Sequence, residues 1–201
     1  MALLFAMWWV MMVGMMLPSA APMTLTFATI NGRRRERGSP YVPTALFVAG
    51  YLLVWGAFSL AATAAQWALE RAALMTPMMR TSSALLGGLL FVAAGVYQLT
   101  PLKHACLRRC RSPLDFVLQR WRDGAPGALR MGAEHGAFCL GCCALLMTLL
   151  FVGGVMNLLW VAAIALFVLL EKVIPAGEML SRAGGVLAIG FGAWMAIRGL
   201  G

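Results

Sequence analysis

The chain has 201 residues, of which 62% are hydrophobic and 11% are charged, and its formal net charge is +9. A soluble domain is typically about half apolar and about a quarter charged, so this composition excludes an ordinary water-soluble fold. The basic residues lie between apolar blocks and show no arginine–aromatic interleaving of the kind that reads RNA or DNA, so we expect no nucleic-acid partner.

The apolar blocks predict an all-α fold, a polytopic transmembrane bundle that forms a single integral membrane domain. A helix needs roughly 20 apolar residues to cross the hydrocarbon core of a bilayer, and about six blocks approach that length. The fourth and fifth blocks run together, and we divide them at Gly153 and Gly154 because one helix of that length would overrun a single crossing. The predicted helices cover residues 1–30, 41–69, 81–100, 135–156, 157–172 and 181–200.

The first block contains two prolines, Pro18 and Pro22, in an otherwise helical pattern. Proline has no backbone N–H, so the carbonyls of Gly14 and Pro18 lose their helical donors. Carbonyls inside a bilayer must find other partners, and Ser19 is placed to satisfy one of them. We therefore expect a kinked helix here, either repaired by neighbouring helices or lying beside a functional site.

Residues 101–134 hold much of the charge and predict a cytoplasmic loop between helices three and four. Within this loop, helical spacing predicts a short helix on the inner membrane surface through Leu114, Val117, Leu118 and Trp121. With six crossings, 13 of the 16 Lys and Arg residues fall on one side of the membrane. The positive-inside rule then places those loops in the cytoplasm and both termini outside.

Small residues at helix contacts let backbones approach in a bilayer, where lipid provides no hydrophobic drive between helices. We expect this role for Gly87, Gly88, Gly184, Gly185, Gly190 and Gly192.

All five cysteines lie in the second half of the chain, in two groups. Cys106 and Cys110 follow His104 and share a face if their segment is helical. Cys139, Cys142 and Cys143 lie on one face of the fourth predicted helix. On the same helix, His135 lies one turn before Cys139, and Met147 lies one turn after Cys143.

The predicted topology brings both cysteine groups and both histidines to the cytoplasmic side. Thiols stay reduced in the cytoplasm, so metal ligation is a better expectation there than disulfides. Soft thiolate and thioether ligands select Cu(I), Zn(II) or iron–sulfur clusters. A zinc ribbon needs two tightly spaced pairs, and only Cys139 and Cys142 form one, so zinc is the weaker prediction. Met15 and Met16 beside the proline kink are second-tier ligands, or flexible packing residues.

Glu171 is an acidic residue at the edge of an apolar block, where ionisable groups are costly. Either it pairs with Arg182, or it serves as a hard metal ligand or a proton acceptor.

At these residues the sequence resembles a bacterial family described as predicted metal-binding integral membrane proteins of unknown function. The resemblance covers nearly the whole chain and implies an inner-membrane protein with a metal site at its cysteines. One departure is Ala144, where the family pattern has Trp after the paired cysteines. The matching motifs are the Met-Met-Leu-Pro-Ser run at 15–19 with Pro22, the segment 97–103 followed by Cys106 and Cys110, Cys139 with 141–143, Met147, 154–158, and Glu171 with Lys172.

We expect a noncatalytic membrane protein that binds a soft metal ion, foremost Cu(I), for transport or delivery. Its partners would be the lipid bilayer and a soluble protein that donates or accepts the metal. Two alternatives stay open. One is a transmembrane thiol–disulfide oxidoreductase that uses Cys139 and Cys142, which the absence of cysteine from residues 1–100 disfavours. The other is a scaffold whose cytoplasmic loop docks a soluble partner.

Overall fold

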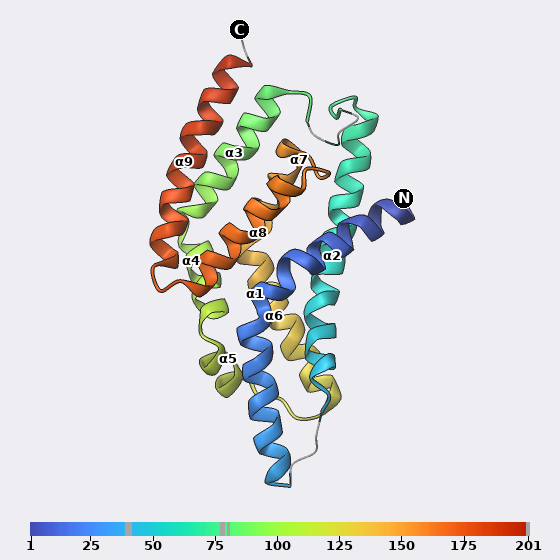
Figure 1. Cartoon of the computed structure of the whole chain (residues 1–201), viewed down its shortest axis with the longest axis vertical. Coiled ribbons are helices and arrows are strands. Elements are labelled where there is room, and N and C mark those ends of the chain that lie inside the picture. Colours follow the sequence, from blue (N-terminus) through green and yellow to red (C-terminus); the bar gives the residue numbers. More distant parts are fainter. Residues whose placement is uncertain (39–41, 77–78, 80, 200–201) are drawn as a thin grey trace. The chain divides into compact units, whose positions relative to one another are not determined.

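The computed structural model describes residues 1–38, 42–76, 79 and 81–199. The described residues are mainly helical, which confirms the all-α class (Figure 1). The predicted helix limits at 41 and 200 lie outside the described residues. In chain order, the helices are α1 Ala2–Glu36, α2 Thr44–Arg71, α3 Ala84–Gln98, α4 Pro101–Arg111, α5 Pro113–Arg120, α6 Gly124–Thr148, α7 Leu150–Gly153, α8 Leu158–Val173 and α9 Gly177–Arg198.

The prediction of about six membrane-spanning helices is not confirmed. By length and composition, helices able to cross a membrane within the described ranges are Ala2–Glu36, Thr44–Arg71, Gly124–Gly153 and Gly177–Arg198. The helices α3 and α4 would add a fifth, broken span with a bend of 66° between them. The difference arises because α3 has 15 residues and α8 has 16, fewer than the roughly 20 that one crossing needs.

The segment 101–134, predicted as a loop with one short helix, is helical over most of its length. Pro101 and Pro113 begin α4 and α5, where the missing N–H would have no helical partner anyway. The helix α6 begins at Gly124 instead of residue 135. Its charges are accommodated because Glu134 accepts hydrogen bonds from Arg120 at 3.1 Å and from Arg130 at 3.3 Å.

The predicted division of the long apolar stretch into two helices is confirmed. The helix α7 ends at Gly153, and Gly154 has a φ of 92°, a conformation that glycine adopts readily. The side chain of Asn157 then accepts a hydrogen bond from the Trp160 backbone N–H and caps the start of α8.

The chain divides into two compact units, and α2, α4 and α6 contribute residues to both. Unit 1 comprises Met1–Ala61 and Cys106–Gly141, and unit 2 comprises Ala62–Ala105 and Cys142–Gly201. Unit 1 holds α1 and α5, and unit 2 holds α3, α7, α8 and α9.

In unit 1, α2 and α6 approach at backbone distance. A Cβ placed on Gly132 of α6 would lie 1.9 Å from the Phe47 carbonyl oxygen, and one on Gly50 of α2 would lie 2.0 Å from the Leu129 oxygen. Only glycine fits these two positions. The hydrophobic core beside this contact consists of Met23, Phe27, Val42, Phe47, Phe116, Val117, Ala128 and Met131.

In unit 2, α3 packs along α9 through glycines. A Cβ on Gly88 would lie 2.6 Å from the Gly192 oxygen, and a Cβ on Gly95 would lie 2.6 Å from the Gly185 oxygen. The packing role predicted for Gly88, Gly185 and Gly192 is therefore confirmed. The same prediction is wrong for Gly190, which has no atom within 4 Å of its ideal Cβ.

Candidate metal centre

The helix α6 carries a stripe of buried metal-ligating side chains. Members on successive turns are three or four residues apart, and two members are adjacent in the sequence, which puts the set on one broad face. Each side chain in the stripe is at most 2% exposed. The stripe consists of His135, Cys139, Cys142, Cys143 and Met147. The three cysteines therefore lie on one face of a continuous helix, Gly124–Thr148, as the sequence predicts.

Within unit 1, the thiol of Cys139 is tied to the kinked part of α1 through Tyr51 of α2. The Tyr51 hydroxyl lies 3.1 Å from the Cys139 Sγ and donates a hydrogen bond of 3.2 Å to the Met16 carbonyl oxygen. Ser19 donates to the same oxygen at 2.9 Å. Ser19 thus satisfies a carbonyl near Pro18, as expected, although the acceptor is Met16 and not one of the two carbonyls predicted to be freed.

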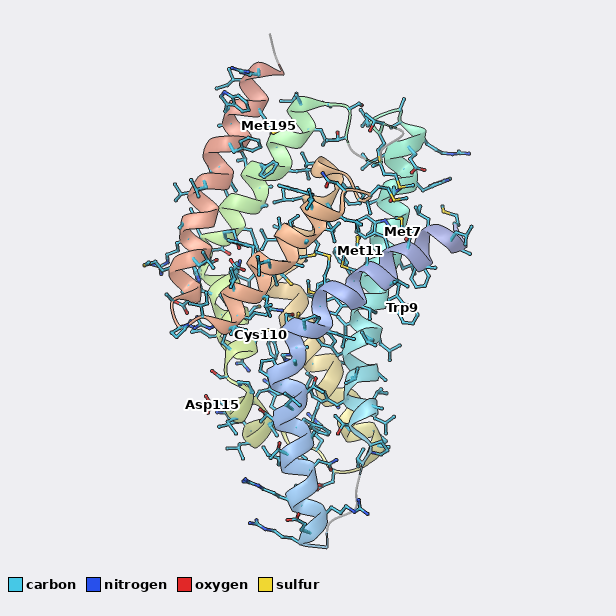
Figure 2. The ribbon with its side chains drawn as sticks, in the orientation of Figure 1. Met7, Trp9, Met11, Cys110, Asp115 and Met195 are labelled. Atoms are coloured by element: carbon cyan, nitrogen blue, oxygen red, sulfur yellow. The ribbon has the colours of Figure 1, made fainter. Side chains whose placement is uncertain are left out.

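The bend of α1 brings methionine sulfur into the same unit. The helix stays continuous through Pro18 and Pro22, and Figure 1 shows it bent near its middle, as proline inside a helix predicts. Met15 is 5% exposed and Met16 is fully buried. The methionines nearer the N-terminus, Met7 and Met11, lie on the other side of the bend (Figure 2).

His135 lies among aromatic rings in unit 1. Its imidazole stacks on Tyr51 with ring centroids 5.5 Å apart and on Phe47 at 6.2 Å, and it meets the edge of Phe116 at 5.7 Å. These contacts fix the plane of the ring beside Cys139, one turn further along α6.

The cysteines of α4 approach α6 from a different side. The Sγ of Cys106 lies 2.8 Å from the ideal Cβ position of Gly141, so glycine is needed there to admit the thiol. Gly141 points roughly 160° around the helix from Cys139 at 100° per residue. In unit 1, Cys106 therefore does not share a face of α6 with Cys139. Cys110 is buried, and none of the five cysteines forms a disulfide within the described residues.

Within the described residues, no ready-made metal site consists of three or more Cys, His, Asp or Glu ligands. No three Cys, His, Asp or Glu side chains there lie close enough together to hold a metal ion. Methionine sulfur is not among those ligand types. A copper site in this state would therefore combine one or two of these residues with thioether sulfur.

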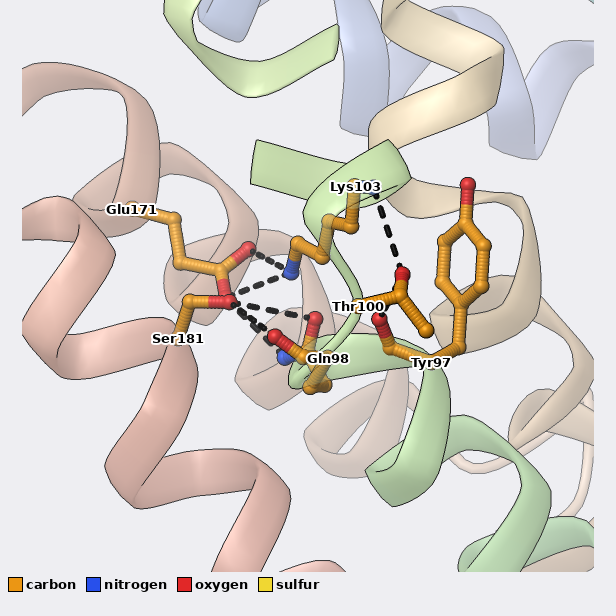
Figure 3. Close-up of polar contacts among 6 residues, drawn as sticks. All are labelled: Tyr97, Gln98, Thr100, Lys103, Glu171 and Ser181. Atoms are coloured by element: carbon orange, nitrogen blue, oxygen red, sulfur yellow. Dashed lines mark hydrogen bonds and ion pairs between the residues drawn. The ribbon is translucent and has the colours of Figure 1, made fainter. Parts of the chain in front are cut away.

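Unit 2 contains a buried ion pair that the sequence did not reveal (Figure 3). The Lys103 Nζ donates to both carboxylate oxygens of Glu171, at 2.8 and 2.9 Å, and the Gln98 amide donates to one of them at 3.0 Å. The Ser181 hydroxyl lies 3.4 Å from the Gln98 side-chain oxygen. The side chains of the ion pair are 0% and 2% exposed.

Lys103, not the predicted Arg182, is the partner of Glu171. The sequence assigned Lys103 to a cytoplasmic loop, whereas it lies in the first turn of α4, where its backbone N–H bonds the Thr100 hydroxyl at 3.3 Å. The helices α3 and α4 are bent by 66° from each other, and Lys103 in the first turn of α4 reaches Glu171 of α8. The Thr-Pro pair at 100 and 101 is the local signal for that helix start.

The polar network brings a hard ligand into electrostatic range of a soft one. The Cys142 thiol lies close enough to Glu171 for an electrostatic interaction, and both belong to unit 2. His104, which is 8% exposed, lies in the same unit next to Lys103 in sequence.

One protein-family model matches this chain over most of its length. The model of the PpoB2 copper chaperone family matches residues 5–195, a range that includes every candidate ligand named above. No curated protein and no solved structure matches the chain. The match agrees with the metal-binding character that the sequence resemblance implied, and it specifies copper. The chain therefore belongs to the PpoB2 copper chaperone family.

Proposed function

We propose that this protein is a membrane-embedded copper chaperone that holds Cu(I) at the buried sulfur ligands of α6 and passes it to a soluble acceptor. It binds and transfers an ion and catalyses no reaction of its own. The observation that carries the proposal is the stripe of cysteine thiols on one face of α6, at most 2% exposed, in a chain of a copper chaperone family.

The ligand chemistry supports Cu(I) over Zn(II). Thiolate and thioether sulfur are soft ligands that select Cu(I), whereas structural zinc takes four Cys, His or carboxylate ligands in a tetrahedron. The described residues contain no cluster of three such side chains, but they do contain methionines buried in the same units as the thiols. A Cu(I) site, which needs few ligands and accepts thioether sulfur, therefore fits these side chains better than a zinc site does.

The residues take different parts in the proposal. The thiol ligands come from Cys139, Cys142 and Cys143, of which one or two bind the ion at a time together with thioether sulfur. Binding would release their thiol protons, because only the thiolate ligates. Met147 of α6 and Met15 and Met16 of α1 supply thioether sulfur. His135, on the α6 stripe, is a second-tier ligand. Cys106, Cys110 and His104 on α4 form a separate capture group, since Cys106 approaches α6 from another side.

The lipid bilayer is the second proposed partner, beside the soluble copper acceptor. Helices that could cross it include α1, α2 and α9, by their length and apolar composition. Under the positive-inside rule, the arginine-rich C-terminal end of α1 would lie in the cytoplasm. With the six crossings expected from the sequence, α4 would lie there too, and both termini would lie outside the inner membrane. Copper would then be exchanged with a soluble protein on the cytoplasmic side.

The test measures copper in purified protein after replacement of thiols on two helices. A variant with Ser at positions 139, 142 and 143 should lose its bound copper, measured by elemental analysis after loading with Cu(I) under reducing conditions. The matched control, Cys106→Ser with Cys110→Ser, removes thiols from α4 and should keep the copper stoichiometry while loading more slowly. Full copper content in the α6 variant would refute the proposed ligands.

The thiol oxidoreductase alternative finds less support. Disulfide exchange needs a thiolate that a partner sulfur can reach. Cys139 and Cys142 are 1% and 2% exposed, so a partner thiol has no path to them in this state. A buried thiol is compatible with holding a metal ion that arrives through the protein.

A further inference from the structure

Unit 1 contains a cationic cleft whose lining includes none of the proposed copper ligands. It has a volume of about 200 Å³ and lies between the C-terminal part of α4 and the helix α5. Asp115, one of the lining residues, lies on α5 and is labelled in Figure 2. The polar side chains that line it are Arg108, Arg109, Ser112, Asp115, Gln119 and Arg120. The lining therefore contains three cations and one carboxylate.

The guanidinium groups are held in place before any ligand arrives. Arg109 lies over the ring of Phe138 at 5.0 Å from its centroid, and Arg120 lies over the same ring at 5.7 Å. Arg120 also donates to Glu134 at 3.1 Å. A single phenyl ring on α6 thus orients two arginines of the cleft, which lowers the entropy that a ligand must overcome to bind them.

Arg109 and Ser112 are the donors of the cleft that meet the least competition from acceptors in the described part of the chain. Arg109 forms no ion pair within the part of the chain that the structure describes. Ser112 is the N-cap of α5, yet its hydroxyl makes no capping bond, so it can turn toward a ligand. Pro113 lacks an N–H, and the next backbone donors, at Leu114 and Asp115, are among those that a helix start leaves without helical partners.

We propose that this cleft binds a phosphate group, carried either by a small soluble anion or by the headgroup of an anionic phospholipid. Planar guanidinium groups bind phosphate oxygens through paired N–H donors, and the α5 N-terminus adds favourable dipole and hydroxyl contacts. The small volume suits one phosphate group better than a peptide segment. The exposed Leu114 and Leu118 on α5, at 60% and 70%, put an apolar surface on the same short helix and make a lipid source relevant.

The experiment titrates full-length protein in detergent micelles with inorganic phosphate and, separately, measures lipid retention by native mass spectrometry. The lipid arm compares nanodiscs of phosphatidylcholine with nanodiscs that also contain phosphatidylglycerol. Arg109→Gln should weaken phosphate binding about tenfold or more, the equivalent of one charge-assisted contact. Asp115→Asn should strengthen it, because a like charge leaves the cleft. Arg33→Gln is the control, since it removes an equal charge from an exposed position on α1.

The outcomes separate the two sources of phosphate. Saturable phosphate binding that Arg109→Gln weakens and Arg33→Gln does not supports a soluble anion. Selective retention of phosphatidylglycerol with the same dependence supports a lipid headgroup. An equal effect of both arginine variants, or no selective binding in either arm, overturns the proposal. Copper content should be unchanged throughout, and the gain expected for Asp115→Asn keeps the test valid if Arg109→Gln misfolds.

Discussion

Removing Lys103 should destabilise the protein because it isolates a buried carboxylate. In the native state Glu171 accepts two hydrogen bonds from Lys103, at 2.8 and 2.9 Å, and both side chains are at most 2% exposed. Lys103→Met keeps a similar chain length but leaves only the Gln98 amide as a donor to the carboxylate. Breaking a buried pair from one side costs about 3–5 kcal/mol.

Replacing both partners should restore much of this loss. Apolar residues of similar volume often substitute for a buried ion pair at little cost, since neither charge must then be desolvated. We expect the double variant Lys103→Met with Glu171→Leu to be more stable than either single variant. A smaller penalty will remain, because the Gln98 amide loses its acceptor.

The assay is denaturant unfolding of the purified variants in detergent, followed by far-ultraviolet circular dichroism. Arg182→Met is the matched control, because it removes one cation from an exposed position near the same helix end. Its cost should be below about 1 kcal/mol, as for surface charges. If Lys103→Met costs no more than this control, or if the penalties of the two single variants simply add in the double variant, the buried pair is not a coupled unit.

Two further substitutions test the packing around the proposed copper ligands. Tyr51→Phe removes the hydroxyl that joins Cys139 to α1 and should lower the unfolding free energy by about 1–3 kcal/mol without changing copper stoichiometry; wild-type stability would show that this bridge is unimportant. Gly132→Ala forces a Cβ to within 1.9 Å of the Phe47 oxygen and should lower the unfolding free energy by about 1–3 kcal/mol, which thermal unfolding would detect as a lower midpoint. Gly190→Ala, which meets no atom within 4 Å, should be neutral or slightly stabilising, and an equal loss in both glycine variants would contradict the backbone contact.

Much of the local structure could be predicted from residue patterns alone. The apolar blocks predicted the all-α class, because a long run without polar residues can satisfy its backbone only within helices in a bilayer. The break at Gly154 was predictable from chain length and glycine. So was the shared face of the three α6 cysteines, which depends only on 3.6 residues per turn.

Patterns of charge were less informative than patterns of apolar residues. The segment 101–134 was read as a loop because it is rich in arginine, yet Glu134 pairs with arginines and α6 extends back to Gly124. A charged segment shows only that some of its side chains face water. A helix can carry charges on one face while it packs with another. The short helices α3 and α8 also showed that an apolar block need not be a full crossing.

The sequence by itself determined that the apolar segments are helical and which side chains share a helix face, because these properties repeat along a few neighbouring residues. Only the tertiary structure decided that Glu171 pairs with Lys103, that Tyr51 joins Cys139 to the bend in α1, and that Cys106 reaches α6 away from Cys139. Each of these contacts joins residues more than thirty positions apart. Their geometry depends on the bend between helices and on glycine-permitted approach, and no local spacing encodes either of them.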